Sequence, residues 1–149
     1  MIYLVHHGKA TDPMVNAQRP LTAAGKVAVR ELAVYAKDRG AVPVEIWHSG
    51  KLRARQTAEA FRAVCNPLAA FSMVRGLQSA DPSDIMADRL VWECRDLMLV
   101  GHMPHVDRLL RRLVGRIGAE DQIQFPSHGL VALFSNDNGV TWLETWRSG

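Results

Sequence analysis

The first ten residues, MIYLVHHGKA (1–10), organise the rest of the chain. Ile2–Val5 is an apolar, β-prone run that ends abruptly in His6 and His7, followed by Gly8. A buried strand that ends in this way delivers a reactive side chain to the edge of a sheet, where α/β proteins form their ligand crevices. The glycine lets the backbone turn and approach a ligand closely. The stretch predicts that His7 is a nucleophile.

Composition indicates one ordinary globular domain. The chain has 149 residues, of which 48% are hydrophobic and 22% are charged. The net charge of +3 is small and the chain has no long run of Lys or Arg, which argues against a nucleic-acid partner or a membrane surface. The N-terminal residues lack the pattern of a signal peptide and no apolar run is long enough to span a bilayer, so we expect a cytoplasmic protein. Cys65 and Cys94 match no metal-binding or redox spacing and are expected to be reduced core residues.

Hydrophobic periodicity predicts strands and helices in alternation. The expected strands are Ile2–Val5, Val42–Trp47, Phe71–Val74, Leu97–Val100, Leu130–Phe134 and Val140–Trp146, and the expected helices are 22–39, 52–64, 82–94 and 106–114. Asn136–Gly139 predicts a hairpin between the last two strands, and the polar stretch Gly115–Ser127 is expected to be irregular. This order predicts a single domain over residues 1–149, a three-layer α/β/α sandwich whose central sheet is mostly parallel with an antiparallel edge.

Three predicted strands end in similar sequences, His6-His7-Gly8, His48-Ser49-Gly50 and Gly101-His102. Because the carboxyl ends of parallel strands share one edge, these groups are expected to meet. Arg53 lies in the first turn of a helix, where its charge opposes the helix dipole unless an anion is nearby. Together with Arg19, the set suits a phosphoryl group, whose oxygens must be neutralised as it transfers. A histidine nucleophile would divide the reaction into transfer to imidazole and hydrolysis by water.

Four ordered segments resemble the signatures of the histidine phosphatase superfamily, and most closely its short SixA-type phosphohistidine phosphatase branch. HHG (6–8) stands for the family's Arg-His-Gly, RPLTAAG (19–25) for Arg-Pro-Leu-Thr-x-x-Gly, SGKLRARQT (49–57) for Ser-Pro-x-x-Arg-Ala-x-Gln-Thr, and GHMP (101–104) for Gly-His-x-Pro. The resemblance spans nearly the whole chain and implies the phosphoglycerate-mutase-like fold.

The resemblance also implies roles for individual residues. His7 corresponds to the phosphorylated nucleophile, Arg53 to a phosphate-binding arginine, and His102 to the second histidine that contacts the phosphoryl group. Three further residues are expected around the same pocket, namely Arg19, Ser49 and Ser127. No metal and no cofactor are implied. The implied substrate is a phosphorylated protein carrying phosphohistidine, or a small phosphorylated molecule.

His6 is the main departure from the family pattern, which has arginine at this position. Arginine offers a fixed fork of donors and a permanent charge, whereas histidine has at most two donors and is largely neutral at pH 7. Losing one charge-assisted contact would cost about 2–4 kcal/mol of phosphate binding or transition-state stabilisation. His6 would retain a phosphate-binding role as imidazolium if a bound dianion raised its pKa. Gly50 in place of the usual proline is expected only to loosen a turn.

The chain also lacks the long insertion that carries a carboxylate general acid in larger family members. Asp81 and Asp84 lie near the corresponding region, but helix capping explains both. A phosphohistidine substrate tolerates this absence, because imidazole is a better leaving group than an alkoxide.

Two other functions remain open at this point. The change at His6 is also expected of a non-catalytic, phosphate-binding regulatory module. A zinc site is the other alternative, because neutral imidazoles bind zinc. Adjacent His6 and His7 would point to opposite faces of a continuing strand, and the nearby arginines would repel a cation. Both observations argue against a zinc site. The candidate ligands of such a zinc site are His6, His7, His48, His102 and His128.

The remaining polar and aromatic side chains have structural interpretations. His48 and His128 are expected to form pocket walls, His105 to lie exposed on its helix, Arg55 to serve the helix surface, and Trp47, Trp92, Trp142 and Trp146 to pack in the core and on the sheet.

Overall fold

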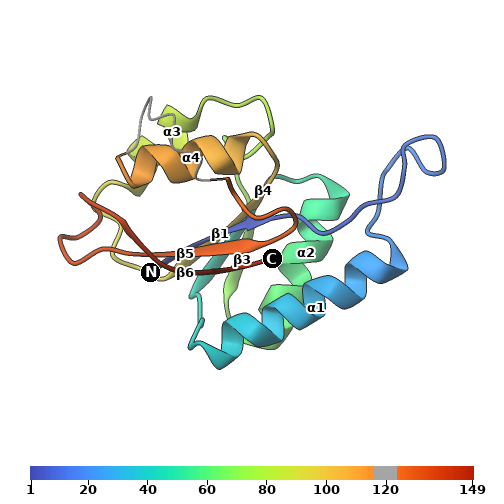
Figure 1. The fold of residues 1–149 in the computed structure, drawn as a ribbon, viewed down its shortest axis with the longest axis horizontal. Coiled ribbons are helices and arrows are strands. Elements are labelled where there is room, and N and C mark those ends of the chain that lie inside the picture. Colours follow the sequence, from blue (N-terminus) through green and yellow to red (C-terminus); the bar gives the residue numbers. More distant parts are fainter. Residues whose placement is uncertain (116–123) are drawn as a thin grey trace.

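The computed structural model describes residues 1–115 and 124–149, which form a six-stranded sheet between two pairs of helices (Figure 1). The strands are β1 (Ile2–His6), β2 (Glu45–His48), β3 (Ala70–Met73), β4 (Leu97–Gly101), β5 (Leu130–Phe134) and β6 (Leu143–Ser148). The helices are α1 (Ala23–Asp38), α2 (Leu52–Cys65), α3 (Ser83–Leu90) and α4 (His105–Leu113). Most of the predicted Gly115–Ser127 stretch, residues 116–123, lies outside the described residues.

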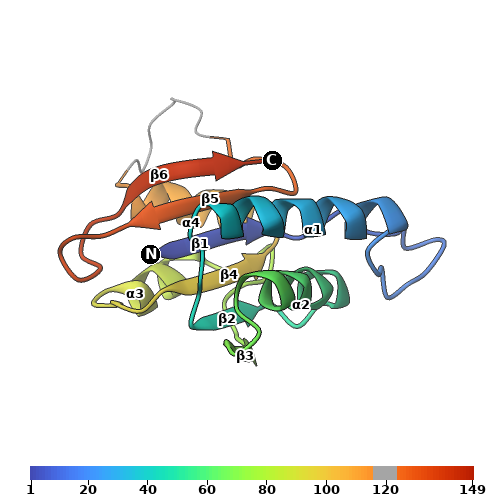
Figure 2. The same cartoon turned by 90° about the horizontal axis from the view of Figure 1, so that it is seen from below.

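The strand order is β3-β2-β4-β1-β5-β6. The first four of these strands are parallel, whereas β5 runs antiparallel to β1 and β6 antiparallel to β5. Helices α1 and α2 cover one face of the sheet, and α3 and α4 cover the other (Figure 2). The predicted three-layer sandwich, with a mostly parallel sheet and an antiparallel edge, is confirmed.

The first ten residues contain β1, which lies with β4 at the centre of the sheet. Residues of β1 and β4 alternate between the two cores, so that every side chain of Ile2–Val5 and Leu97–Val100 is at most 2% exposed. Such continuous apolar runs are characteristic of strands covered on both faces. The polar side chains that follow these runs therefore lie directly at the edge of a rigid, buried scaffold.

Helix α1 begins where the sequence predicts. The Thr22 hydroxyl accepts a hydrogen bond from the Gly25 N–H over 2.9 Å, which satisfies a free donor of the first turn. The Thr22 N–H in turn donates to the Lys9 carbonyl over 3.0 Å. The start of α1 is thus attached to the segment that follows β1.

The predicted helix 82–94 is too long, because α3 ends at Leu90. Val91 has an extended conformation, and Glu93 then forms a local turn in which its carboxylate accepts from the Arg95 N–H and guanidinium. As a result Trp92 is 69% exposed and Cys94 is exposed, contrary to their expected core positions. Helical spacing alone does not reveal where such a side-chain turn interrupts a helix.

The terminal hairpin also differs in detail from its prediction. Strand β6 begins at Leu143 rather than Val140, because Asp137 organises a longer connection. The Asp137 carboxylate accepts from the Thr141 N–H and from the Ser135 hydroxyl. Across residues 1–115 and 124–149, no helix has the length and apolar character needed to cross a bilayer.

Candidate active site

The carboxyl ends of β2, β4 and β1 lie side by side, because these parallel strands are neighbours in the sheet. His6 at the end of β1 is in register with Gly101 at the end of β4, and the His7 N–H donates to the Gly101 carbonyl over 3.1 Å. The His7 and His102 rings consequently lie with their centroids 5.0 Å apart. The expected convergence of the strand ends is observed.

The hydrogen bond of the His7 ring determines which nitrogen is free to react. Nδ1 lies 2.7 Å from the Gly8 carbonyl oxygen. A carbonyl only accepts, so Nδ1 carries the proton and Nε2 of the neutral ring keeps its lone pair. Burial, together with the nearby charges of Arg53, His128 and Arg19, lowers the pKa of His7 to about 4, although the Gly8 bond acts in the opposite direction. At neutral pH the ring is therefore an uncharged base with Nε2 available.

Two side chains of α2 that sequence reasoning did not single out hold the surrounding backbone in place. The fully buried Thr57 hydroxyl accepts from the Gly8 N–H over 3.0 Å and donates to the Arg53 carbonyl over 2.8 Å. Gln56 Oε1 accepts from the Leu21 N–H over 2.8 Å. Both residues belong to the segment SGKLRARQT (49–57), and their position at the end of that motif was the available signal.

The second imidazole is oriented by the end of β2. Ser49 Oγ lies 2.6 Å from His102 Nε2, and both residues are buried. Gln78 fixes the Ser49 backbone by donating to its carbonyl over 2.7 Å. Burial, followed by the charges of His7 and Arg53, lowers the pKa of His102 to about 3. His102 is therefore also neutral at pH 7.

Arg53 supplies the strongest sign that the site accepts an anion. Its Nε is buried and has no hydrogen-bond partner in the described parts of the chain. A buried donor left unpaired costs about 1–3 kcal/mol, and more when it is charged. Burial and the neighbouring charge of Arg19 lower the pKa of Arg53, and the Arg53 charge in turn lowers the pKa of both His7 and His102. Within the described residues, two guanidinium groups and two imidazoles thus lie near one another and affect each other's pKa values.

Comparison with known proteins matches this fold to solved structures. No family model matches the chain, and no curated protein matches it. The protein histidine phosphatase SixA, solved with tungstate, superposes with a TM-score of 0.83 at 21% identity, covering 98% of this chain and 94% of SixA. This chain has the histidine phosphatase fold.

Two further structures extend the comparison. An Agrobacterium tumefaciens protein assigned as a SixA phosphohistidine phosphatase gives a TM-score of 0.79 at 24% identity, covering 99% of this chain and 96% of the other. Plasmodium falciparum phosphoglycerate mutase gives 0.73 at 16% identity, covering 97% and 87%. The histidine phosphatase fold inferred from four short motifs is confirmed.

His6, the main departure from the histidine phosphatase pattern, is tied to a residue from the other end of the chain. The His128 N–H donates to His6 Nδ1 over 2.8 Å, and the two rings stack with centroids 4.6 Å apart. Burial and the neighbouring His7 lower the pKa of His6 to about 3. The lowered pKa and the hydrogen bond to Nδ1 both oppose the imidazolium form of His6 that the sequence suggested. An Nδ1 that accepts a hydrogen bond cannot also carry a proton. His6 is left with one donor, Nε2–H.

The His6 and His7 rings do not point to opposite faces, contrary to the expectation from sequence. Strand β1 ends at His6, so the alternation of faces does not persist through His7. The His6 and His7 rings lie edge to face with centroids 4.6 Å apart. One ring nitrogen from each of His6, His7 and His128 lies within 4.8 Å of the others.

The backbone at position 50 explains why glycine stands there in place of the proline of the histidine phosphatase motif. Its φ is +91°, which proline cannot adopt and other L-residues rarely do. The Gly50 N–H donates to His48 Nδ1 over 3.1 Å, a bond that proline could not form. The turn after β2 is therefore a different turn rather than a looser one.

A basic hollow lies beside Arg53 at the start of α2. It has a volume of about 440 Å³ and lies between the start of α2 and the loop that precedes α1. Three cationic side chains line it, those of Lys51, Arg53 and Arg55. Arg55 also forms an exposed ion pair with Glu59 one helical turn further on, as expected for a residue of the helix surface.

Other side chains considered for the site have structural partners or are exposed. Asp81 accepts from the Gln78 N–H over 2.8 Å, and Asp84 forms an exposed ion pair with Arg112 at 3.5 Å, so both carboxylates have structural partners. Ser127 is exposed, and the His48 ring packs on Phe71 with centroids 4.8 Å apart.

The expectation that His105 is exposed is wrong. His105 is fully buried, because the first turn of α4 packs with its apolar stripe against the core. Neither ring nitrogen has a partner within the described residues, and burial lowers the pKa of this ring.

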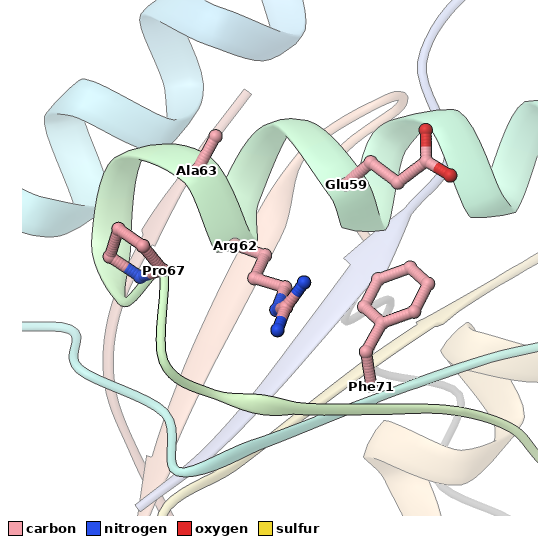
Figure 3. Close-up of a pocket in the computed structure, with 5 residues that line it drawn as sticks. All are labelled: Glu59, Arg62, Ala63, Pro67 and Phe71. Carbon is pink, nitrogen blue, oxygen red and sulfur yellow. The ribbon is translucent and has the colours of Figure 1, made fainter.

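A second pocket, of about 370 Å³, lies between the C-terminal half of α2 and β3 (Figure 3). Arg62 and Phe71 face each other in it, and the Arg62 Nε donates to the Ala69 carbonyl over 2.8 Å. The residues lining this pocket include no histidine, cysteine or serine. It is therefore not the candidate active site.

The depressed histidine pKa values predict acid sensitivity of the fold. The unfolded chain has histidines with a pKa of about 6.5, whereas His6, His7 and His102 have pKa values of about 3, 4 and 3 when folded. Between these limits the unfolded state binds more protons, so the free energy of unfolding falls as the pH decreases below about 6.5. We expect the urea midpoint to be lower at pH 5.0 than at pH 7.5. His6→Asn should flatten this dependence, and a midpoint that is constant over this range would contradict the buried neutral rings.

Proposed function

We propose that this protein is a metal-independent phosphatase that acts through a phosphohistidine formed on His7. The observation that carries the proposal is the lone pair of His7 Nε2, fixed by the Gly8 carbonyl, beside an arginine whose buried Nε has no partner among the described residues. Phosphoryl transfer to a histidine requires at least a nucleophile held in one tautomer and an adjacent group that binds the anion.

The reaction we infer has two steps. His7 Nε2 attacks phosphorus while the bond from phosphorus to the leaving oxygen or nitrogen breaks, which gives a phosphorylated His7. Water then attacks this phosphorus, the N–P bond breaks, and inorganic phosphate leaves with His7 neutral again. Arg53 and Arg19 would neutralise the equatorial oxygens, and His102 would donate to one of them.

A phosphoryl group carried by a protein histidine is the substrate class we favour. The leaving imidazole of such a substrate departs without a strong general acid, and both Asp81 and Asp84 already have structural partners. The basic hollow formed by Lys51, Arg53 and Arg55 would accept acidic groups that flank the phosphoryl group. A small phosphoester is the alternative substrate class.

We also infer that the protein works in a reducing compartment such as the cytoplasm. Cys65 is buried, Cys94 is exposed, and both are free thiols. An exposed free thiol is typical of proteins that are kept reduced.

A non-catalytic phosphate-binding module is the second candidate, and His6 is the observation that favours it. A neutral His6 with one free donor offers much less to a transition state than an arginine fork. Such a module would bind phosphate through Arg53 without turning it over.

One experiment separates these functions. The protein is incubated with phosphoramidate and with p-nitrophenyl phosphate in excess EDTA, and the quenched protein is analysed for acid-labile, base-stable phosphate on His7. Turnover with this phosphate present supports the proposal. Tungstate binding without turnover supports the regulatory module, and activity that EDTA destroys and zinc restores would contradict a metal-independent enzyme.

We expect His6→Arg to raise kcat/KM by about tenfold or more, because it adds a permanent charge and a fork of donors beside the phosphoryl group. The measurement is steady-state hydrolysis of p-nitrophenyl phosphate. His6→Asn is the matched control, because it preserves an acceptor for the His128 N–H and adds no charge. An unchanged or lower rate for His6→Arg would indicate that His6 serves a different task.

A further inference from the structure

The three-histidine cluster, formed by His6, His7 and His128, includes a residue that the proposed phosphatase does not use. His128 comes from the segment before β5 and is exposed. Its ring stacks on His6 and lies with its centroid 5.8 Å from that of His7. One ring nitrogen from each residue lies within 4.8 Å of the other two.

Two members of the cluster are prepared for metal binding by their hydrogen bonds. His7 Nδ1 faces the Gly8 carbonyl at 2.7 Å, and His128 Nδ1 faces the His7 carbonyl at 2.6 Å. Because a carbonyl only accepts, both Nδ1 atoms carry protons, and in the neutral form of each ring the lone pair is on Nε2. Metal-ligating histidines almost always have this arrangement, in which the other ring nitrogen donates to a carbonyl or carboxylate.

His6 is the third and weaker ligand. Its Nδ1 accepts from the His128 N–H over 2.8 Å, so Nε2 holds the proton of the neutral ring. Ligation by His6 requires the ring to give up this bond or to exchange its tautomer. Ligand nitrogens of tetrahedral zinc lie about 3.3 Å apart. The structure brings one ring nitrogen of each histidine within 4.8 Å of the others, so ligation also requires the side chains to rotate and draw closer.

The chemistry of the cluster limits which cation it would accept. The cluster offers only imidazole nitrogens as ligands, and these suit zinc, nickel and copper rather than magnesium or calcium. The charges of Arg53 and Arg19, which reach His7, oppose any cation and weaken binding. A late transition metal, held by directional bonds to nitrogen, is the class that overcomes this repulsion.

We propose that the three-histidine cluster binds Zn²⁺ through Nε2 of His7 and Nε2 of His128, with His6 as a third ligand, and that the bound ion inhibits the enzyme. The ion would occupy the lone pair with which His7 attacks phosphorus. Binding stands on the cluster alone, whereas inhibition rests on the proposed phosphatase function.

The binding test is calorimetric titration of the full chain with Zn²⁺ at pH 7.5 without substrate. We expect one equivalent to bind, with affinity about tenfold weaker or more in His128→Ala and in His6→Arg. His48→Asn is the matched control, because His48 packs on Phe71 outside the cluster, and it should bind as the unaltered protein does. Circular dichroism establishes that each variant is folded. Equal affinity in the unaltered protein and in His128→Ala would overturn the proposal.

A second measurement does not depend on any variant. Co²⁺ substituted for zinc in the unaltered protein should give the visible absorption of a tetrahedral site with nitrogen ligands, and the spectrum of free aqueous Co²⁺ would overturn the assignment. Zn²⁺ should also inhibit hydrolysis of p-nitrophenyl phosphate, and EDTA should reverse it. An inactive protein that binds zinc would defeat the proposed function only, whereas an active protein that binds no zinc would defeat this inference only.

Discussion

Replacing His7 with alanine will lower kcat/KM for p-nitrophenyl phosphate by about 10⁴-fold or more, as removal of a covalent nucleophile does in other enzymes. The reason is that Nε2 of His7 is the atom whose lone pair the Gly8 carbonyl keeps free. The acid-labile phosphate on the protein should disappear with the activity. Steady-state kinetics and phosphate trapping on the same preparations provide the measurement.

Two controls make the His7 result specific. The variant should keep its fold and should bind tungstate within about tenfold of the unaltered protein, because Arg53 and Arg19 supply the charge that holds the anion. His48→Asn replaces another buried histidine of the same sheet edge, one that packs on Phe71, and we expect it to change activity by at most a few-fold. Substantial activity in folded His7→Ala would exclude the phosphohistidine mechanism.

Replacing Arg53 with alanine will lower kcat by about 10²–10³-fold, the usual effect of removing one preorganised donor from a transition state. The free energy of unfolding, in contrast, should not fall. The Arg53 Nε is buried and has no partner among the described residues, and burial together with the neighbouring Arg19 charge lowers the pKa of Arg53. Removal of an unsatisfied buried donor relieves a desolvation cost of about 1–3 kcal/mol, so the free energy of unfolding should stay constant or rise.

Companion variants distinguish the geometry of Arg53 from its charge. Arg53→Lys keeps a charge but loses the planar fork, and we expect an intermediate loss of about tenfold in kcat. Arg30→Ala removes one exposed charge from α1 and should alter neither activity nor stability. If Arg53→Ala were clearly less stable than the unaltered protein, Arg53 would be a structural residue and not a residue that binds an anion.

Much of the fold was predictable because the pattern of burial is local. Ile2–Val5 and Leu97–Val100 are continuous apolar runs, and only strands covered on both faces bury such runs completely. Boundaries were less predictable. Helix α3 ends at Leu90 because the Glu93 carboxylate bonds to Arg95, an interaction that the helical spacing of apolar residues does not register.

The candidate site was predictable in its members but not in its protonation. Strand ends that carry His7 and His102 must meet at one edge once the sheet is parallel, so the sequence alone indicated that these rings lie together. It did not indicate that the Thr57 hydroxyl would bind the Gly8 N–H, or that His105 would be buried, because each depends on what another element places opposite the side chain.

The amino-acid sequence by itself determined the layers, the direction of the central strands and the list of residues at their ends, since these follow from local apolar patterning and from the geometry of parallel sheets. Only the tertiary structure decided which nitrogen of His7 carries a proton and that His6 accepts a hydrogen bond from a residue 122 positions away. It also decided that the buried Nε of Arg53 has no hydrogen-bond partner among the described residues. The physical reason is that hydrogen-bond partners and burial are contributed by segments distant in sequence, and these alone fix tautomers and pKa values.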